Sequence, residues 1–574
     1  MYSFHFFDRW SPGRRIGVSG ALICWLGLAG ACQAAEIIKA DVCIYGGTAG
    51  GVAAAVQAAR MGKTAVLVEF GGHLGGMTSG GLGATDIGNK AAIGGIAREF
   101  YHLIAQHYAQ EGAWRFEKPE AYFRTSNRQS ALDPLKQPGA TMWTFEPHVA
   151  EDVLFQLINT AGVPVFFQQR LQDVRKNGNL ITELRMENGK VYQAAMFIDT
   201  TYEGDLMAKA GVSYTFGREA NAVYKETLNG IRAQTPKHQF TVRVDPYRKA
   251  GDPVSGLLPF VQAAELGEAG AADRSVQAYN FRLCYTRNPA NRLPHAPPAN
   301  YNPARFELLA RYLEALVDSG RQPQLEEFWN PIAMPNGKTD INNNGGFSTD
   351  FIGANSDYPE GNYAVRSRIW KENEDYIRGL VYFLATSPRV PDNMRLEMQS
   401  WGPAKDEFLD NDNWPRQLYV REARRMVSSY VMTEHNCRGE QTVPDAIGLA
   451  AYTMDSHNCR RLVRDGSAQN EGDVQVGGFP PYPIAYRSIV PETSQCGNLA
   501  VPVCLSASHI AYGSIRMEPV FMILGQSAAT AASLALDERV ALQHLRYGRL
   551  RSRLMADGQI LSWPTGGQSA GARP

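Results

Sequence analysis

The sequence has no excess of either charge and no cysteine pair at the spacing of metal ligands. Lysine plus arginine number 57 of 574 residues, as do aspartate plus glutamate, so no bulk charge attracts nucleic acid or an anionic membrane. The 8 cysteines include no C-x-x-C pair, so iron–sulfur and zinc sites have almost no support. Heptads, low-complexity tracts and fixed-period repeats are also missing. These absences predict a globular protein with no metal site and no nucleic-acid partner.

Long hydrophobic runs are equally scarce. The one near the start, Ile16 to Ala31, follows Arg14-Arg15 and leads to small residues that end at Ala35. This order of regions is typical of a signal peptide, and the apolar part is too short for a stable membrane span. We therefore expect a signal peptide over residues 1–35 and a periplasmic or secreted protein. The arginine pair leaves twin-arginine export and general secretion as equal alternatives.

Export changes what is expected of the cysteines. Cys43 and Cys284 stand alone in apolar or strand-like segments, which is typical of packed thiols. An oxidising compartment favours one or two disulfides among the cysteines of the last third of the chain, namely Cys437, Cys459, Cys496 and Cys504.

Glycine, by contrast, is abundant and clustered, and residues 40–69 are the most informative cluster. An apolar run ends in a glycine turn, a helix of small residues follows, and a second apolar run ends in Glu69. Gly46 permits the tight turn, Gly51 lets helix and strand pack closely, and the freed amides face a pyrophosphate. Glu69 lies 18 positions after Gly51, where a carboxylate can bind a ribose. Thr48 replaces the middle glycine of G-x-G-x-x-G, so the motif departs from the dinucleotide-binding pattern at one position.

A second glycine-rich stretch covers residues 71–83, where leucine and methionine are interleaved. Glycine at this density predicts that the backbone passes very close to something flat or charged. Helices are expected near 96–109 and 149–161, with short strands between 163 and 194. Between about Gly217 and Trp414, prolines and aromatic residues increase and the strand–helix alternation fades. This change indicates a cap domain inserted into the nucleotide-binding fold.

The glycine unit, the Gly-Gly-x-x-Gly-Gly stretch and the segment from Phe197 to Asp205 resemble the FAD-dependent oxidoreductases. Within them the chain is most similar to a large secreted group called xanthan-lyase-like or heterodisulfide-reductase-A-like, which is distantly similar to the fumarate reductase flavoprotein. The resemblance runs from about Ala40 to Leu545. It implies FAD as cofactor and an α/β fold, with a Rossmann-like FAD-binding domain of the glutathione-reductase type and an inserted α+β cap domain. Heterodisulfide reductases carry iron–sulfur cysteines that are missing here, so their activity is not carried over.

The resemblance and the composition together imply an order of domains. The FAD-binding domain takes residues 36–216 and returns over residues 415–548. The cap or substrate domain takes residues 217–414, and a C-terminal tail takes residues 549–574.

The resemblance also implies the contacts with FAD. Leu171 matches the strand residue whose backbone meets adenine, and the segment from Leu524 to Ala532 matches a returning glycine turn and helix start at the pyrimidine end of the flavin. A plain alanine-rich packing helix remains the alternative for that segment. The implied cofactor residues are Gly46, Gly47, Thr48, Gly51, Glu69, Gly75, Gly76, Gly80, Gly81, Leu171, Gly525, Gln526 and Ser527.

Candidate catalytic residues gather late in the chain. Oxidation of an alcohol by flavin needs a base for the hydroxyl proton, and histidine suits that role because its pKa lies near neutrality. His509 is the first candidate, because it lies seven positions before Arg516 and close to the expected flavin-contacting helix. His457 is second, since Asp455 could orient its ring. The full catalytic set is His509, His457, His435, Arg421 and Arg516, although Arg421 belongs to a run with Arg424 and Arg425 that equally suits a structural ion network.

These features leave three functions. The favoured one is an exported enzyme that oxidises a hydroxyl of a sugar or sugar-like substrate, with Trp329, Trp370, Trp401 and Trp414 of the cap favouring a neutral, stacking molecule. The second is a reductase of an unsaturated acid or enone, in which arginines clamp carboxylates. The third is a secreted binding protein with a structural flavin. The electron acceptor stays open between oxygen, a quinone and a periplasmic carrier, because no second nucleotide fold is visible.

Overall fold

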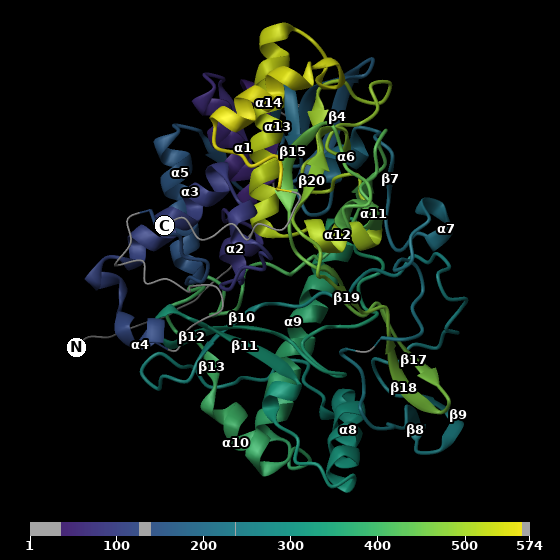
Figure 1. Cartoon of the computed structure of the whole chain (residues 1–574). Coiled ribbons are helices and arrows are strands. Elements are labelled where there is room, and N and C mark those ends of the chain that lie inside the picture. Colours follow the sequence, from purple (N-terminus) through teal and green to yellow (C-terminus); the bar gives the residue numbers. More distant parts are fainter. Residues whose placement is uncertain (1–35, 125–138, 236, 565–574) are drawn as a thin grey trace, which may run out of the picture.

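The computed structural model describes residues 36–124, 139–235 and 237–564 (Figure 1). The expected signal peptide, residues 1–35, lies outside the described residues, as does the end of the expected tail from residue 565. A seven-stranded sheet forms around the first glycine unit, with a main strand order of β3-β2-β1-β6-β5-β4 and with β21 paired to β6. Its strands are β1 (Ile37–Tyr45), β2 (Ala65–Val68), β3 (Val165–Phe166), β4 (Leu171–Asn177), β5 (Leu180–Met186), β6 (Val191–Asp199) and β21 (Leu499–Ala500).

Parallel pairing dominates the centre of this sheet. β1 pairs in parallel with both β2 and β6, and the apolar run Val42–Tyr45 is fully buried between them, as expected of a strand covered on both faces. β4, β5 and β6 form an antiparallel meander at one side. β21, from the end of the chain, pairs in parallel with β6. The expected α/β fold with a Rossmann-like FAD-binding sheet is therefore confirmed.

Two helices of small residues cover the sheet side by side. α1 (Ala49–Arg60) follows the glycine turn, and α13 (Glu518–Glu538) returns from the end of the chain to lie beside it (Figure 1). The helices touch backbone to backbone, since a Cβ on Gly525 would lie 2.1 Å from the carbonyl oxygen of Gly50. Of the described residues, only α13 forms a helix long and apolar enough to cross a membrane, and 94% of its apolar window is buried in the protein, as in a core helix.

Further helices and short pairs of strands belong to the described part of the chain. Among the helices are α2 (Met77–Gly80), α3 (Gly95–Tyr108), α4 (Pro119–Arg124), α5 (Pro147–Thr160), α6 (Asp205–Lys209), α7 (Asn221–Tyr224), α11 (Glu434–Cys437), α12 (His509–Ile515) and α14 (Tyr547–Ala556). The short strand pairs are β7 (Tyr214–Thr215) with β14 (Arg425–Met426), β8 (Tyr247–Lys249) with β9 (Asp252–Leu257), β15 (Ala446–Ala450) with β20 (Tyr482–Ala485), β16 (Met454–Ser456) with β19 (Val474–Val476), and β17 (Arg460–Arg464) with β18 (Ser467–Glu471).

The middle of the chain contributes a second, antiparallel sheet with its own helices (Figure 1). Its strand order is β11-β12-β10-β13, formed by β11 (Trp329–Met334), β12 (Lys338–Asn343), β10 (Leu283–Thr286) and β13 (Gly402–Pro403). The helices of this region are α8 (Glu307–Asp318), α9 (Tyr363–Thr386) and α10 (Asp392–Ser400). These elements all fall within the segment that composition marked as inserted.

The cysteines correct one expectation. All six in the described residues are buried and free, so the disulfides expected among Cys437, Cys459, Cys496 and Cys504 are not formed. Cys43 and Cys284 are packed thiols, as their apolar surroundings predicted.

Candidate active site

The carboxylate of Glu69 follows β2 directly and lies between two backbone amides. The amide of Gly47 donates to Oε2 and the amide of Gly71 donates to Oε1, both at 2.5 Å. Burial raises the pKa of Glu69 to about 7, and the two amide donors oppose that shift. A buried carboxylate at this point of the fold can accept hydrogen bonds from ribose hydroxyls.

Thr48 stands at the departure from the glycine motif, and its side chain turns into the protein. Its Oγ1 donates to the carbonyl of Thr200 at 2.9 Å and accepts from the amide of Gly51 at 3.2 Å, which caps α1. The turn itself depends on Gly46, whose φ is +111° and where a Cβ would lie 2.7 Å from the carbonyl carbon of Thr200. The threonine therefore supplies a helix cap without disturbing the turn.

A cavity of about 380 Å³, here named the cofactor cavity, opens at this end of α1. Four of the expected cofactor residues line it, namely Thr48, Glu69, Gly76 and Gly80. Aromatic and basic side chains complete its wall, among them Tyr358, Tyr363, Trp370, Arg170, Arg366 and Arg416. A carboxylate for ribose, a helix N-terminus for the diphosphate and aromatic rings for adenine are the groups that FAD requires, so these residues fit that cofactor.

The second glycine stretch is closely packed by other parts of the chain. Gly75 donates its amide to the carbonyl of Gly47 at 2.7 Å. A Cβ on Gly76 would lie 2.5 Å from the hydroxyl of Tyr202, and one on Gly80 would lie 2.4 Å from the Cβ of Gln417. A Cβ on Gly81 would lie 2.9 Å from the carbonyl oxygen of Arg282. Only glycine fits this path, whatever else the backbone approaches.

The backbone amide of Leu171, which was expected to contact adenine, already has hydrogen-bond partners in the protein. Its amide donates to the hydroxyls of Tyr45 and Tyr363, at 3.1 and 3.0 Å. The neighbouring Arg170 lines the cofactor cavity, whereas Leu171 is buried in a hydrophobic cluster with Tyr45. The interpretation of Leu171 as the adenine residue therefore stays a prediction that this arrangement does not support.

The expected helix start at Leu524 is wrong, because α13 begins at Glu518. Gly525, Gln526 and Ser527 consequently lie inside the helix and contact protein. Gln526 accepts from the amide of Ile96 at 2.9 Å, and the hydroxyl of Ser527 donates to the carbonyl of Ile447 at 2.7 Å. The packing alternative describes these three residues.

Glu518, the first residue of α13, ties that helix to the glycine stretch. Thr78 and Tyr202 donate hydroxyl hydrogen bonds to its carboxylate, both at 2.7 Å. Burial raises the pKa of Glu518 to about 7. The true helix start thus lies beside the glycine stretch, where its dipole favours negative charge.

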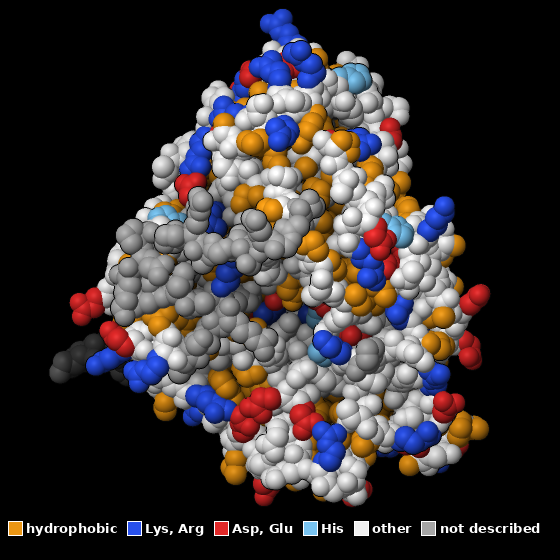
Figure 2. All heavy atoms as spheres, viewed as in Figure 1, with side chains coloured by type: hydrophobic (Ala, Val, Ile, Leu, Met, Phe, Trp, Pro, Cys, Tyr) orange, Lys and Arg blue, Asp and Glu red, His pale blue; other side chains and the backbone are white. Residues whose placement is uncertain are grey.

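A larger cavity of about 810 Å³, here named the polar cavity, begins where the glycine stretch ends, since residues 85–88 are in its wall. Its lining is mainly polar and comes from segments far apart in sequence: Asp86, Lys90, Lys237, His238, Arg282, Asn330, Asn342, Asn343, Tyr419, Tyr452, Asp455, His457 and Gln475. Figure 2 shows a hollow near the middle of the visible face where basic, acidic and histidine side chains meet.

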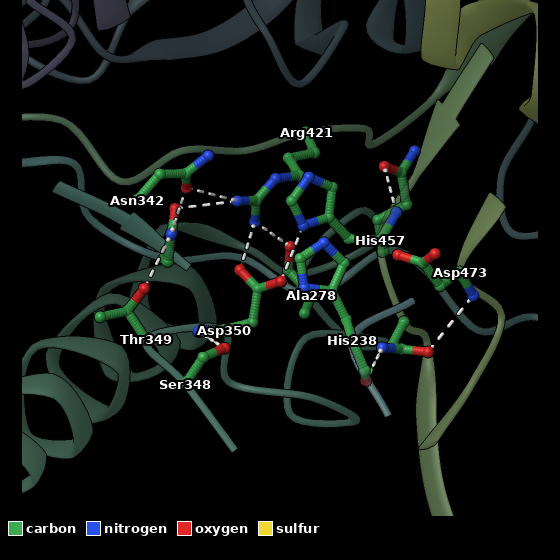
Figure 3. Close-up of polar contacts among 12 residues, drawn as sticks. His238, Ala278, Asn342, Ser348, Thr349, Asp350, Arg421, His457 and Asp473 are labelled. Atoms are coloured by element: carbon green, nitrogen blue, oxygen red, sulfur yellow. Dashed lines mark hydrogen bonds and ion pairs between the residues drawn. The ribbon is translucent and has the colours of Figure 1, made fainter. Parts of the chain in front are cut away.

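His457 is the predicted catalytic residue that this cavity exposes. Its Nδ1 lies 2.7 Å from Oδ2 of Asp350, and its Nε2 lies 3.5 Å from Oδ2 of Asp455 (Figure 3). Burial and Arg421 favour the neutral ring, but Asp350 and Asp455 outweigh them and raise the pKa of His457 above 6.5. His238 stacks on the ring at 6.4 Å between centroids, and burial lowers the pKa of His238 to about 4. His457 is therefore a proton-exchanging group oriented by a carboxylate.

Arg421 and Arg516 contact the two aspartates that flank His457. Arg421 lies 3.0 Å from Oδ1 of Asp350 and points at it together with His457 (Figure 3). Arg516 donates to the hydroxyl of Tyr419 at 2.8 Å and to Asp455 at 3.2 Å. Despite burial, His457 and Arg516 hold the pKa of Asp455 well below its usual range. Neither arginine lines the polar cavity, so both position the groups that do.

His509, the first candidate for the base, is a satisfied buried residue. Its Nδ1 lies 2.8 Å from Glu422 and its Nε2 lies 2.9 Å from the hydroxyl of Ser456. It is 2% exposed and lines neither the cofactor cavity nor the polar cavity. The structure does not support a catalytic role for His509, because both ring nitrogens already have partners.

His435 is remote from both cavities as well. It lies on α11 and pairs with Glu440 at 2.7 Å.

Arg424 and Arg425 belong to the ion network that the sequence left as an alternative, since Arg424 pairs with Asp205 and Arg425 pairs with Glu219. These residues hold segments of the chain together rather than face a ligand.

The four tryptophans do not provide a stacking surface in the polar cavity. Trp329, Trp401 and Trp414 are buried in the core, and Trp370 lines the cofactor cavity. The tryptophans therefore do not support the expectation of a stacked neutral substrate, which stays a prediction. The aromatic residues of the polar cavity are Tyr419 and Tyr452.

Sequence reasoning missed Asp86, Arg282 and Asp350. Asp86 lies three positions after the last residue of the glycine stretch, which is a signal that could have been used. Arg282 and Asp350 come from the inserted segment, where no motif marks them.

A Rossmann-like sheet with a buried carboxylate suited to a ribose, together with a polar cavity lined by a histidine and an aspartate, is typical of a nucleotide-cofactor-dependent oxidoreductase. Residues 41–554 match the family model described as FAD dependent oxidoreductase, and the chain belongs to that family. FAD is accordingly its cofactor. No curated protein matches the sequence.

The chain is similar to several solved flavoenzyme structures at low identity. One is a 3-ketosteroid-delta4-(5alpha)-dehydrogenase from Rhodococcus jostii, with 14% identity, 31% of this chain and 50% of that chain covered, and a TM-score of 0.20. Another is an L-amino acid deaminase from Proteus myxofaciens, with 14% identity, coverage of 33% and 51%, and a TM-score of 0.22. A third is the anhydrotetracycline hydroxylase OxyS from Streptomyces rimosus, with 14% identity, coverage of 37% and 38%, and a TM-score of 0.21. The chain thus spans about half of these structures or less.

Proposed function

We propose that this FAD-dependent oxidoreductase oxidises a hydroxyl group of a sugar or sugar-like substrate in the polar cavity. The main support for this proposal is that the ring of His457 lies in the cavity wall, with its Nδ1 held 2.7 Å from Asp350. The amide, carboxylate and hydroxyl side chains around it suit a molecule with many hydroxyl groups.

The partners of the two ring nitrogens of His457 support Nε2 as the atom that accepts the proton. Despite burial, Arg421 and His457 hold the pKa of Asp350 below its usual range, so its carboxylate accepts and Nδ1 carries the proton. Nε2 is then able to take the proton of a substrate hydroxyl. Asp455, 3.5 Å from Nε2, stabilises the resulting imidazolium. When bound, FAD supplies the hydride acceptor.

A second candidate, reduction of an unsaturated acid or enone, is favoured by one observation. The raised pKa of His457 increases the fraction of molecules in which its ring is protonated near neutrality. A protonated ring can donate a proton to a carbanion-like product. The two candidates assign opposite protonation states to the same residue.

Anaerobic mixing of oxidised holoenzyme with a panel of sugars tests the proposal. We expect one or more members to bleach the flavin, and His457→Gln to slow bleaching by about 10²–10⁴, the usual contribution of a positioned base. His435→Gln is the matched control, because His435 lies at the surface with Glu440 and away from both cavities. A flavin that stays oxidised with every sugar, yet is rapidly reoxidised by an enone after chemical reduction, would establish the reductase instead.

Export belongs to the same proposal. The region that supports it, residues 1–35, contains the arginine pair, the apolar stretch and the small-residue end in the order of a signal peptide. A periplasmic or secreted location would also bring the enzyme to sugars outside the cytoplasm.

A further inference from the structure

Arg282 is a buried arginine in the wall of the polar cavity. Its Nε and Nη2 donate to the two carboxylate oxygens of Asp340, at 2.7 and 2.8 Å. Asp340 also accepts from the amides of Gly83 and Ala84, both at 3.0 Å. The guanidinium is thereby fixed relative to the end of the glycine stretch.

The third nitrogen of this guanidinium, Nη1, is buried and has no hydrogen-bond partner among the residues that the structure describes. The nearest carboxylate is that of Asp86, whose Oδ2 lies 3.5 Å away, beyond hydrogen-bonding distance. An unmade hydrogen bond on a buried charged donor is unfavourable, so a ligand that brings an acceptor to Nη1 gains affinity.

Asp86 is the group that a ligand would meet beside Nη1. The hydroxyl of Tyr452 donates to its Oδ1 at 3.3 Å. Burial raises the pKa of Asp86, against the opposing effect of Arg282. Asp86 can therefore become neutral, or turn toward Tyr452, when another anion pairs with the arginine.

Other charges around the cavity favour an anionic ligand. Lys90 and Lys237 line it together with Asp455, which Arg516 and His457 already engage, and Arg421 and Arg516 lie behind the wall around His457. Asp340 and Asp350 are already engaged by Arg282 and Arg421. In this cavity wall, Nη1 of Arg282 is a charged donor whose hydrogen bond is left unmade by the described residues.

We infer that the substrate is an acidic sugar, such as a uronic or aldonic acid, whose carboxylate binds Nη1 of Arg282 while one of its hydroxyls reaches His457. This inference rests on the proposed oxidation of a sugar hydroxyl. A charge-assisted hydrogen bond to an arginine discriminates strongly, because a neutral sugar leaves the donor unpaired.

Matched pairs of probes test the inference: glucuronate with glucose and galacturonate with galactose. Dissociation constants are measured by calorimetry on His457→Gln holoenzyme, which binds without rapid turnover. We expect each acid to bind at least about tenfold more tightly than its neutral partner, since hydrogen bonds to charged groups are worth that factor or more. The same order should hold for the bleaching rates of the wild-type flavin.

Two variants should change the preference for acids over neutral sugars in opposite directions. Arg282→Lys keeps a positive charge beside Asp340 but loses the rigid fork, so the preference for acids should fall about tenfold or more. Asp86→Asn removes the neighbouring negative charge, so the affinity for acids should rise several-fold relative to the affinity for neutral sugars. Retained FAD and an unchanged circular dichroism spectrum check folding, and Asp86→Asn tests the inference even if Arg282→Lys misfolds.

The outcomes separate this inference from the proposed function. If neutral sugars bleach the flavin and acids neither bind nor bleach it, the inference is wrong and the function stands. If acids bind in an Arg282-dependent way but no sugar reduces the flavin, the function is wrong and the carboxylate site stands. Unchanged acid binding in Asp86→Asn together with equal affinities for acid and neutral sugar would also overturn the inference.

Discussion

Glu69, in the wall of the cofactor cavity, and Glu518, at the start of α13, are two buried carboxylates whose properties are set by single contacts. Both have a pKa raised to about 7 by burial, and both receive hydrogen bonds from uncharged donors only. The position of Glu69 was predictable because it follows directly from the spacing of one continuous unit. The structure does not support the choice of His509 over His457, because nearness in sequence says nothing of the hydrogen-bond partners that a ring has in the folded chain.

At this scale we predict that Glu69→Gln weakens FAD binding. The amides of Gly47 and Gly71 both donate to the present carboxylate, so an amide nitrogen in place of one oxygen faces a donor with a donor. The expected loss is about 1–3 kcal/mol, measured by titrating apoprotein with FAD. Glu187→Gln, at an exposed turn, is the matched control and should bind FAD as the wild type does.

The same titration has a pH dependence. The folded-state pKa of Glu69 is about 7, above its ordinary value, because burial disfavours the charge. Ribose hydroxyls that donate to the carboxylate favour the ionised form, so FAD affinity should rise as the pH rises through about 7. Glu69→Gln should flatten this rise. An equally steep rise in the variant would assign it to another group.

At the scale of elements, the β1–α1–β2 unit was predictable because one short segment contains the strand, the turn, the helix and the acid. α13 was predicted with a start six residues too late. The glycine at position 525 resembled a turn, yet it is a packing site against Gly50 inside a continuous helix. The usable signal was Glu518-Pro519, since an acid and a proline are typical of a first helical turn.

We therefore predict that Gly525→Ala destabilises the protein. Its Cβ would lie 2.1 Å from a backbone oxygen of α1, so the two helices must move apart. The expected loss in the free energy of unfolding is about 1–3 kcal/mol, measured in urea with FAD bound. Gly548→Ala in α14 is the control with the opposite sign. No atom of the described residues lies within 4 Å of its added Cβ, so alanine should stabilise the protein by about 0.4–1 kcal/mol. Equal effects of the two substitutions would contradict the packing account.

At the scale of the whole molecule, the polar cavity is assembled from segments that begin at residue 85 and end at residue 475. No local pattern marks such a set, because its members are brought together only by the docking of the inserted segment. Composition did indicate that an insertion exists, and the antiparallel sheet and helices found there agree with a changed architecture. The residues Asp86, Arg282 and Asp350 could not be grouped before their contacts were known.

Export is also a property of the whole chain. We predict that the mature protein is found outside the cytoplasm and begins near Glu36. Changing both Arg14 and Arg15 to lysine distinguishes the routes, because twin-arginine export of folded holoprotein depends on the arginines and general secretion does not. Fractionation and N-terminal sequencing provide the measurement, and a full-length cytoplasmic protein would contradict export.

The pH dependence of anaerobic flavin reduction tests the central claim most directly. With a sugar that reduces the flavin, we expect the rate of flavin reduction to rise with pH through an apparent pKa above 6.5. His457 must be neutral to accept the hydroxyl proton, and its carboxylate partners raise its pKa. His457→Gln should remove this rise, and Asp350→Asn should shift it to lower pH. A rate that falls with pH, or a rise that persists unchanged in His457→Gln, would contradict the assignment of His457 as the base.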